Sequence, residues 1–131
     1  MPEAVNGTTR IHYDTKGDRN NPSILLINGY TQPMTSFMDG FCQLLVDAGY
    51  HVIRFDNRDV GLTSKTQGDP PDLQRIITAV MANQTPPQVP YTLEDMAADA
   101  FAVLDAASIS SAHIVGVSMG GYIAQTMAIT D

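Results

Sequence analysis

The amino-acid sequence predicts an α/β fold in which a mostly parallel sheet is flanked by helices. Short apolar runs alternate with stretches whose apolar residues recur at helical spacing, a pattern typical of strand–helix–strand units. The run at 23–28, Ser-Ile-Leu-Leu-Ile-Asn, is continuous, rich in strand-forming residues and bounded by Pro22 and Gly29, which suits a strand buried on both faces. With 131 residues, the chain has room for one domain.

Local patterns place the individual elements. Strands are expected at 9–14 (one half of an N-terminal hairpin), 23–28, 50–56 and 112–117. Helices are expected at 35–48, 72–84, 92–107 and 120–129. Thr92 and Asp95 form a capping box at the start of the third helix, with Asp in place of the usual Glu or Gln. A polar loop over 57–71 and a three-proline connector over 86–90 flank the second helix.

Acidic residues on the third helix lie opposite its apolar stripe. Asp95, Asp99 and Asp105 are separated from the stripe that runs from Leu93 to Ala107. Since the apolar stripe of an amphipathic helix faces the core, these three carboxylates are expected to face solvent.

Charge and composition exclude several classes of function. Seven basic and fourteen acidic residues give a formal net charge of −7, which disfavours nucleic acid and anionic membranes as partners. No apolar run approaches the roughly 20 residues that cross a bilayer, and the N-terminus lacks a signal-peptide pattern, so a cytoplasmic setting is expected. The single cysteine, Cys42, excludes an internal disulfide; it is either a small packed residue or a reactive thiol.

Gly116-Val117-Ser118-Met119-Gly120 matches the G-x-S-x-G motif of a nucleophile elbow. The motif lies where an apolar strand is expected to end and a helix to begin. Ser118 is therefore the candidate nucleophile, held in a strained conformation at a sharp turn. Gly116 and Gly120 are expected to prevent a collision across the turn, and Gly121 to let the helix pack closely on the strand. The alternative is a glycine-rich turn with an incidental serine.

An oxyanion formed during attack on a carbonyl needs preorganised hydrogen-bond donors. The backbone N–H of Met119, next to the serine, is one candidate. The second is the backbone N–H of Tyr30, in the turn Asn28-Gly29-Tyr30 that follows the 23–28 strand. The alternative is a plain turn at the end of a strand.

Three blocks, LLINGY, FDNRDVGLTS and HIVGVSMGGYIAQ, together resemble the α/β-hydrolase superfamily, and are most similar to its serine esterases of the aclacinomycin methylesterase type. The resemblance implies the N-terminal part of an α/β-hydrolase domain spanning 1–131, with the C-terminal strands missing. It also implies that Asp56, Arg58 and Asp59 brace a loop beside the site, together with Asn28 and Gly29. Asn28 departs from the family, which usually has His there.

The resemblance implies hydrolysis of a small-molecule carboxylic ester through an acyl-enzyme, with no metal and no organic cofactor. A serine needs a base, which the family supplies from a late His oriented by an Asp. His51 and His113 begin their strands, and five residues of strand span about 16 Å, so both are expected at the wrong end of the sheet. His12 belongs to the N-terminal strand and is also expected to be distant.

Two hypotheses follow from the missing base. In the first, the acid and base come from a C-terminal portion or a partner chain, and the isolated chain is inactive. In the second, the chain is a non-catalytic truncated fragment. In both, the 112–117 strand is an open apolar edge that associates with a C-terminal half or with another copy. Acyl transfer, perhydrolysis and a receptor-like binding role remain open alternatives.

Overall fold

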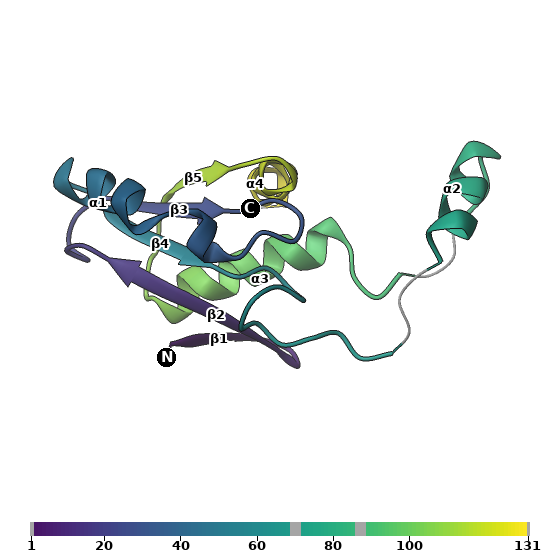
Figure 1. Cartoon of the computed structure of the whole chain (residues 1–131), viewed down its shortest axis with the longest axis horizontal. Helices are drawn as coiled ribbons and strands as arrows, with labels where there is room; N and C mark the ends of the chain where they lie inside the picture. Colours follow the sequence, from purple (N-terminus) through teal and green to yellow (C-terminus); the bar gives the residue numbers. More distant parts are fainter. Residues whose placement is uncertain (1, 69–71, 86–88, 131) are drawn as a thin grey trace.

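The computed structural model describes residues 2–68, 72–85 and 89–130, so parts of the predicted loop (69–71) and connector (86–88) lie outside the described residues. In the described part, five strands form one mixed sheet in the order β1-β2-β4-β3-β5 (Figure 1). The strands are β1 (Glu3–Asn6), β2 (Thr9–Lys16), β3 (Ser23–Ile27), β4 (His51–Phe55) and β5 (His113–Gly116). The α/β fold is confirmed, as is the N-terminal hairpin, whose two strands pair antiparallel.

The strands β4, β3 and β5 run parallel, so their carboxyl ends meet at one edge of the sheet. β3 pairs in parallel with both β4 and β5, and the register sets Leu26 opposite Arg54 and Ile27 opposite Gly116. Segments that follow these strands therefore emerge side by side. Open α/β sheets place their ligands at this edge.

Helices cover both faces of the sheet. α1 (Asp39–Asp47) covers one face, and α3 (Leu93–Ala106) and α4 (Met119–Thr130) cover the other, whereas α2 (Leu73–Met81) belongs to neither layer. Alternation along the strands divides the core, because Leu25 and Ile27 pack with α3 and α4 whereas Ile24 and Leu26 pack with α1. Within the described residues, none of the helices is long and apolar enough to cross a membrane.

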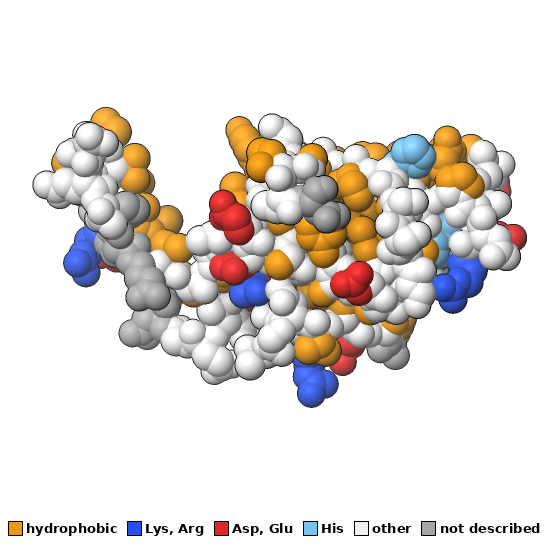
Figure 2. All heavy atoms as spheres, turned by 180° about the vertical axis from the view of Figure 1, so that it is seen from behind, with side chains coloured by type: hydrophobic (Ala, Val, Ile, Leu, Met, Phe, Trp, Pro, Cys, Tyr) orange, Lys and Arg blue, Asp and Glu red, His pale blue; other side chains and the backbone are white. Residues whose placement is uncertain are grey.

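The helix α2 stands apart from the sheet (Figure 1). Asp72 caps it by accepting a hydrogen bond from Arg75 N–H. Four of its apolar side chains are exposed, and Figure 2 shows hydrophobic side chains on the outlying arm of the molecule. These side chains are Leu73, Ile77, Val80 and Met81.

The helix predicted over 35–48 begins too early. A short 3-10 turn, Met34–Ser36, comes first, and α1 starts at Asp39. Long-range bonds explain the delay: Asp56 Oδ1 accepts from Met34 N–H at 2.7 Å, and Arg54 Nη1 donates to the Phe37 carbonyl at 2.6 Å. The other predicted helices and strands are present with small shifts at their ends.

The prediction that Asp99 faces solvent is wrong. Its side chain is buried, and the residue is 1% exposed. The polar side of α3 at this point lies against β1 and the loop that follows β4, where Arg58 pairs with the carboxylate at 2.6 Å. A helical pattern identifies the apolar stripe, but it does not show that a second element covers part of the polar side.

Candidate active site

Ser118 lies in a sharp turn between β5 and α4. Its φ is 55°, in the left-handed region that non-glycine residues rarely adopt, and its side chain is exposed. Two backbone hydrogen bonds hold the turn: Val117 N–H donates to the Ile27 carbonyl at 3.0 Å, and Gly121 N–H donates to the Ser118 carbonyl at 2.9 Å. The serine hydroxyl is thus presented at the carboxyl edge of the sheet on a strained backbone.

The glycines around Ser118 differ in what they prevent. A Cβ on Gly116 would collide with the Gly120 carbonyl oxygen and come within 2.6 Å of Gly121 N, so a side chain at this position would not fit across the turn. A Cβ on Gly120 would instead collide with the end of β3, 2.7 Å from Ile27 C. The role expected for Gly121 is not what the geometry shows, since a Cβ there would make an ordinary contact at 3.6 Å with Gly116 O.

The loop that follows β3, residues 28–33, lies directly against the serine. A Cβ placed on Gly29 would be 3.1 Å from Ser118 Cβ. Asn28 is buried and shapes this 28–33 loop, because its Nδ2 donates to the Pro33 carbonyl at 2.8 Å. Its Oδ1 accepts from Gly29 N–H at 3.1 Å. The asparagine therefore closes the loop by its own hydrogen bonds.

The two candidate oxyanion donors are the backbone N–H groups of Met119, which follows Ser118, and of Tyr30, which follows Gly29. Among the described residues, no partner accepts a hydrogen bond from the N–H of Met119 or of Tyr30. Met119 is the first residue of α4, whose unsatisfied N–H groups and dipole favour negative charge. Tyr30 follows Gly29 in the 28–33 loop, and its side chain is exposed.

Asp56 joins the loops that follow β3 and β4. Its buried carboxylate accepts from Met34 N–H through Oδ1 and from Leu62 N–H through Oδ2 at 3.0 Å. Gly61 has a φ of 55°, and a Cβ there would collide with the Asp56 carboxylate. Asp56 is therefore fully engaged in holding backbone.

Arg58 and Asp59 take different partners in the loop after β4. Arg58 makes two hydrogen bonds to Asp99, which raise the pKa of the guanidinium, and it lies 5.3 Å over the Tyr91 ring. Asp59 accepts from Thr66 and from the Tyr91 hydroxyl. Burial opposes ionisation of Asp59, but these hydrogen bonds outweigh it and lower its pKa.

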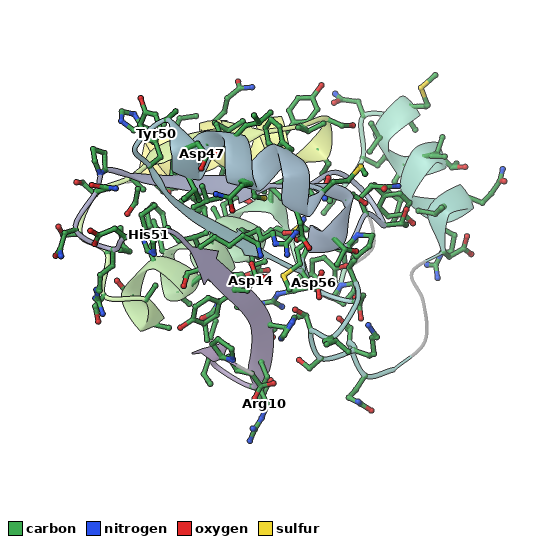
Figure 3. All side chains as sticks on the ribbon, turned by 60° about the vertical axis from the view of Figure 1, so that its left-hand side comes forward. Arg10, Asp14, Asp47, Tyr50, His51 and Asp56 are labelled. Atoms are coloured by element: carbon green, nitrogen blue, oxygen red, sulfur yellow. The ribbon has the colours of Figure 1, made fainter. Side chains whose placement is uncertain are left out.

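The histidines lie away from Ser118, as expected. His113 and His51 begin β5 and β4, at the amino edge, and Figure 3 shows His51 at the far end from Asp56. His51 Nδ1 is instead 3.1 Å from Ser23 Oγ, and burial lowers its pKa. His12 is buried on β2, which β4 and β3 separate from β5.

Two residues that sequence patterns missed support the site. Asn57 Nδ2 donates to the Asn28 carbonyl at 3.1 Å, between two buried residues. Asp99 holds Arg58, the next residue along the loop. The signal for Asn57 was its position within FDNRD, where its neighbours were already candidates. Over residues 2–68, 72–85 and 89–130, His, Cys, Asp and Glu side chains form no group of three or more that could hold a metal ion.

Comparisons with known proteins agree with this geometry. The family model described as the alpha/beta hydrolase fold matches residues 22–131. The rhodomycin D methylesterase of Streptomyces peucetius is 36% identical over 113 residues, which are 86% of this chain and 32% of that protein. This chain therefore spans about a third of that relative's length.

Solved structures show the same fold. Est816, described as an N-acyl homoserine lactone degrading enzyme, superposes with a TM-score of 0.72 at 25% identity, covering 98% of this chain and 40% of Est816. Epoxide hydrolase A of Mycobacterium thermoresistibile superposes with a TM-score of 0.73 at 24% identity, and the match covers 97% of this chain and 34% of the epoxide hydrolase. At this identity the likeness shows the fold alone. With strand order, elbow and family match in agreement, the chain belongs to the α/β-hydrolase family.

Proposed function

We propose that this chain carries the nucleophile and oxyanion donors of a serine hydrolase that acts on a small-molecule carboxylic ester. The observation that carries the proposal is the contact between two segments far apart in the sequence: the exposed Ser118, at a φ of 55°, lies against Gly29 of the 28–33 loop. The contact supports Met119 N–H, next to Ser118, and Tyr30 N–H, next to Gly29, as the proposed pair of oxyanion donors.

The chemistry that suits this arrangement is acyl transfer to serine. Ser118 Oγ attacks the acyl carbon and forms a C–O bond while a base takes the hydroxyl proton. The N–H groups of Met119 and Tyr30 stabilise the oxyanion that develops. The ester C–O bond then breaks, and the alcohol leaves with the proton. Water repeats the attack on the acyl-enzyme and releases the acid.

One of the named relatives supports an ester as substrate. The Streptomyces peucetius relative is a methylesterase. Because the match covers about a third of that relative's length, an ester substrate is a proposal for this chain. Tyr30 and Val117 are both exposed, so we expect the part of the substrate that contacts them to be apolar.

A base and its orienting acid are proposed to come from polypeptide outside these 131 residues. The described histidines lie on β2 or at the amino edge of the sheet, too far from Ser118 to accept its proton. A second segment that brings His and Asp to the carboxyl edge would complete the machinery.

The surface proposed for that segment is the free edge of β5. β5 pairs with β3 on one side, and Val115 is 43% exposed. Beside it, α3 and α4 flank a groove of about 630 Å³. Its apolar lining includes Phe101, Leu104, Ile109, Ile114, Ala124 and Met127. A strand added along β5 would pair with the backbone N–H and C=O groups of this edge and cover the groove.

Complementation tests the proposal. The chain is incubated with p-nitrophenyl acetate and a fluorophosphonate probe, alone and with the C-terminal part of the Streptomyces peucetius methylesterase. Turnover and labelling are expected in the mixture and not in the chain alone. Ser118→Ala should abolish both. Ser108→Ala is a matched control, because Ser108 is also exposed with a φ of 60°.

Labelling that survives Ser118→Ala would assign the reaction to another residue. A mixture that associates, as judged by light scattering, yet neither labels nor turns over substrate would favour the non-catalytic fragment instead.

A further inference from the structure

We infer that Asp99 is a positioning residue for the 28–33 loop, acting through Arg58 and Asn57; its effect on catalysis rests on the function proposed above. Asp99 lies on α3, which also packs on α4, but among the described residues its carboxylate makes no hydrogen bond to Ser118, Met119 or Tyr30. Its bonds to Arg58 lead to the site through the loop that follows β4.

The Asp99 carboxylate holds two segments at once. Arg58 donates to it twice, from Nε to Oδ2 at 2.6 Å and from Nη2 to Oδ1 at 3.1 Å. Asn6 Nδ2, on β1, donates to Oδ1 at 2.7 Å. Such a buried carboxylate is stable when its oxygens are filled by donors, and a bidentate Arg fixes orientation as well as charge. Asp99 thus clamps the start of the loop against α3 and β1.

Arg58 is also held from its open side. Its guanidinium lies 5.3 Å from the centroid of the Tyr91 ring, and the Tyr91 hydroxyl donates to Asp59 at 3.1 Å. The observed position of Arg58 thus satisfies both its pair with Asp99 and its contact with the Tyr91 ring. Loss of the carboxylate leaves a largely buried cation without its partner.

Asn57 connects this clamp to the site. It precedes Arg58, and its Nδ2 donates to the Asn28 carbonyl at 3.1 Å. Asn28 and Asn57 are both buried, so the bond has little competition from water. The Asn28 carbonyl belongs to the peptide whose nitrogen is that of Gly29, which packs against Ser118. A displacement of Arg58 is therefore passed to the 28–33 loop through one peptide bond and one hydrogen bond.

Hydrogen exchange in the full 131-residue chain tests the connection without any activity. In Asp99→Asn, amides of the 28–33 loop are expected to exchange at least about tenfold faster, because a local unit held by a buried pair opens more often. Asp105→Asn, on the exposed side of the same helix, should leave that loop unchanged. In an Asn57→Ala background, Asp99→Asn should add little at 28–33, since the link is already cut.

Faster exchange confined to 58–66 and α3 would overturn the inference. Should Asp99→Asn fail to fold, Asn57→Ala tests the last link alone, and unchanged exchange at 28–33 in that variant would refute it.

Kinetics in the complemented enzyme separate positioning from stability. Asp99→Asn is expected to lower kcat by about tenfold with KM within about twofold, because oxyanion donors act in the transition state. Unchanged kcat in a less stable protein would reduce Asp99 to a structural role. Absence of turnover in every mixture would count against the proposed function, while the exchange result would still decide the connection to the 28–33 loop.

Discussion

Gly120→Ala and Gly121→Ala are neighbouring substitutions for which the structure predicts opposite effects on stability. Both residues are in the first turn of α4, where Ala is intrinsically favoured over Gly by about 1 kcal/mol. They differ in what the added methyl group meets. At Gly121 it would lie 3.6 Å from Gly116 O, an ordinary contact.

At Gly120 the methyl group would collide with the Ile27 carbonyl oxygen and lie 2.7 Å from Ile27 C and 2.9 Å from Asn28 O. These are backbone atoms of a fully buried strand and its end, so no flexible side chain can move aside. Overpacking in a core costs about 1–3 kcal/mol, and backbone on both sides puts this site at the upper end. After the gain in helix propensity, Gly120→Ala should lower the free energy of unfolding by about 2 kcal/mol.

Urea unfolding followed by far-UV circular dichroism measures both variants. Gly121→Ala should raise the free energy of unfolding by about 0.5–1 kcal/mol, so the pair should differ by about 3 kcal/mol. The measurement is made on whatever assembly the purified chain forms, with protein concentration matched between variants. Equal changes in the two variants would show that α4 does not pack on the end of β3 as described.

Three further predictions concern strain, charge and pH. Ser118→Gly should raise the free energy of unfolding by about 1 kcal/mol relative to Ser118→Ala, because glycine relieves the left-handed backbone; equal thermal denaturation midpoints would argue against strain there. Asp14→Ala should lower the free energy of unfolding by about 3 kcal/mol, because it breaks the pair with the buried Arg54. Asp39→Ala should lower it by under about 1 kcal/mol, because Asp39, the other partner of Arg54, is 79% exposed. Equal shifts of the urea midpoint in the two variants would contradict this ranking. Burial lowers the pKa of His51 in the folded chain, so the unfolded chain binds its proton first and stability should fall as the pH drops below about 6.5; His51→Asn should flatten that fall in urea titrations at pH 7 and pH 5.

Local patterns were sufficient to predict the strands, most helix positions and the elbow. The apolar run at 24–27 predicts a buried strand, and the glycines beside Ser118 predict a sharp turn, from near neighbours in the sequence alone. Thr92 and Asp95 are a further example, because a capping box is complete within four residues, and both of its hydrogen bonds are present. Predictions of this kind need no knowledge of which elements pack together.

Predictions failed where distant residues decide local structure. Met34 and Phe37 are held out of α1 by Asp56 and Arg54, which come from β4 and the residue after it. The helical spacing of apolar residues over 35–48 does not reveal those long-range hydrogen bonds. Asp99 lies on the polar side of α3 and is buried by Arg58, 41 positions away. Gly120 has to be a glycine because a side chain there would collide with the end of β3. The spacing of residues in the sequence does not show that α4 packs against this strand.

These failures share a physical cause that bears on the site itself. The candidate nucleophile is local to the elbow, so one motif reveals it. The candidate oxyanion donors are not local, because Tyr30 is useful only where the 28–33 loop is pressed against Ser118. Asn57 holds that loop, and the loop carrying Asn57 is in turn held by Asp99. Residues that react can thus be read from a motif, whereas those that place a reacting group are found through contacts between elements. In the function proposed for Ser118, substitutions at Asn57 and Asp99 should accordingly change the reactivity of this serine while leaving every residue of the G-x-S-x-G motif in place.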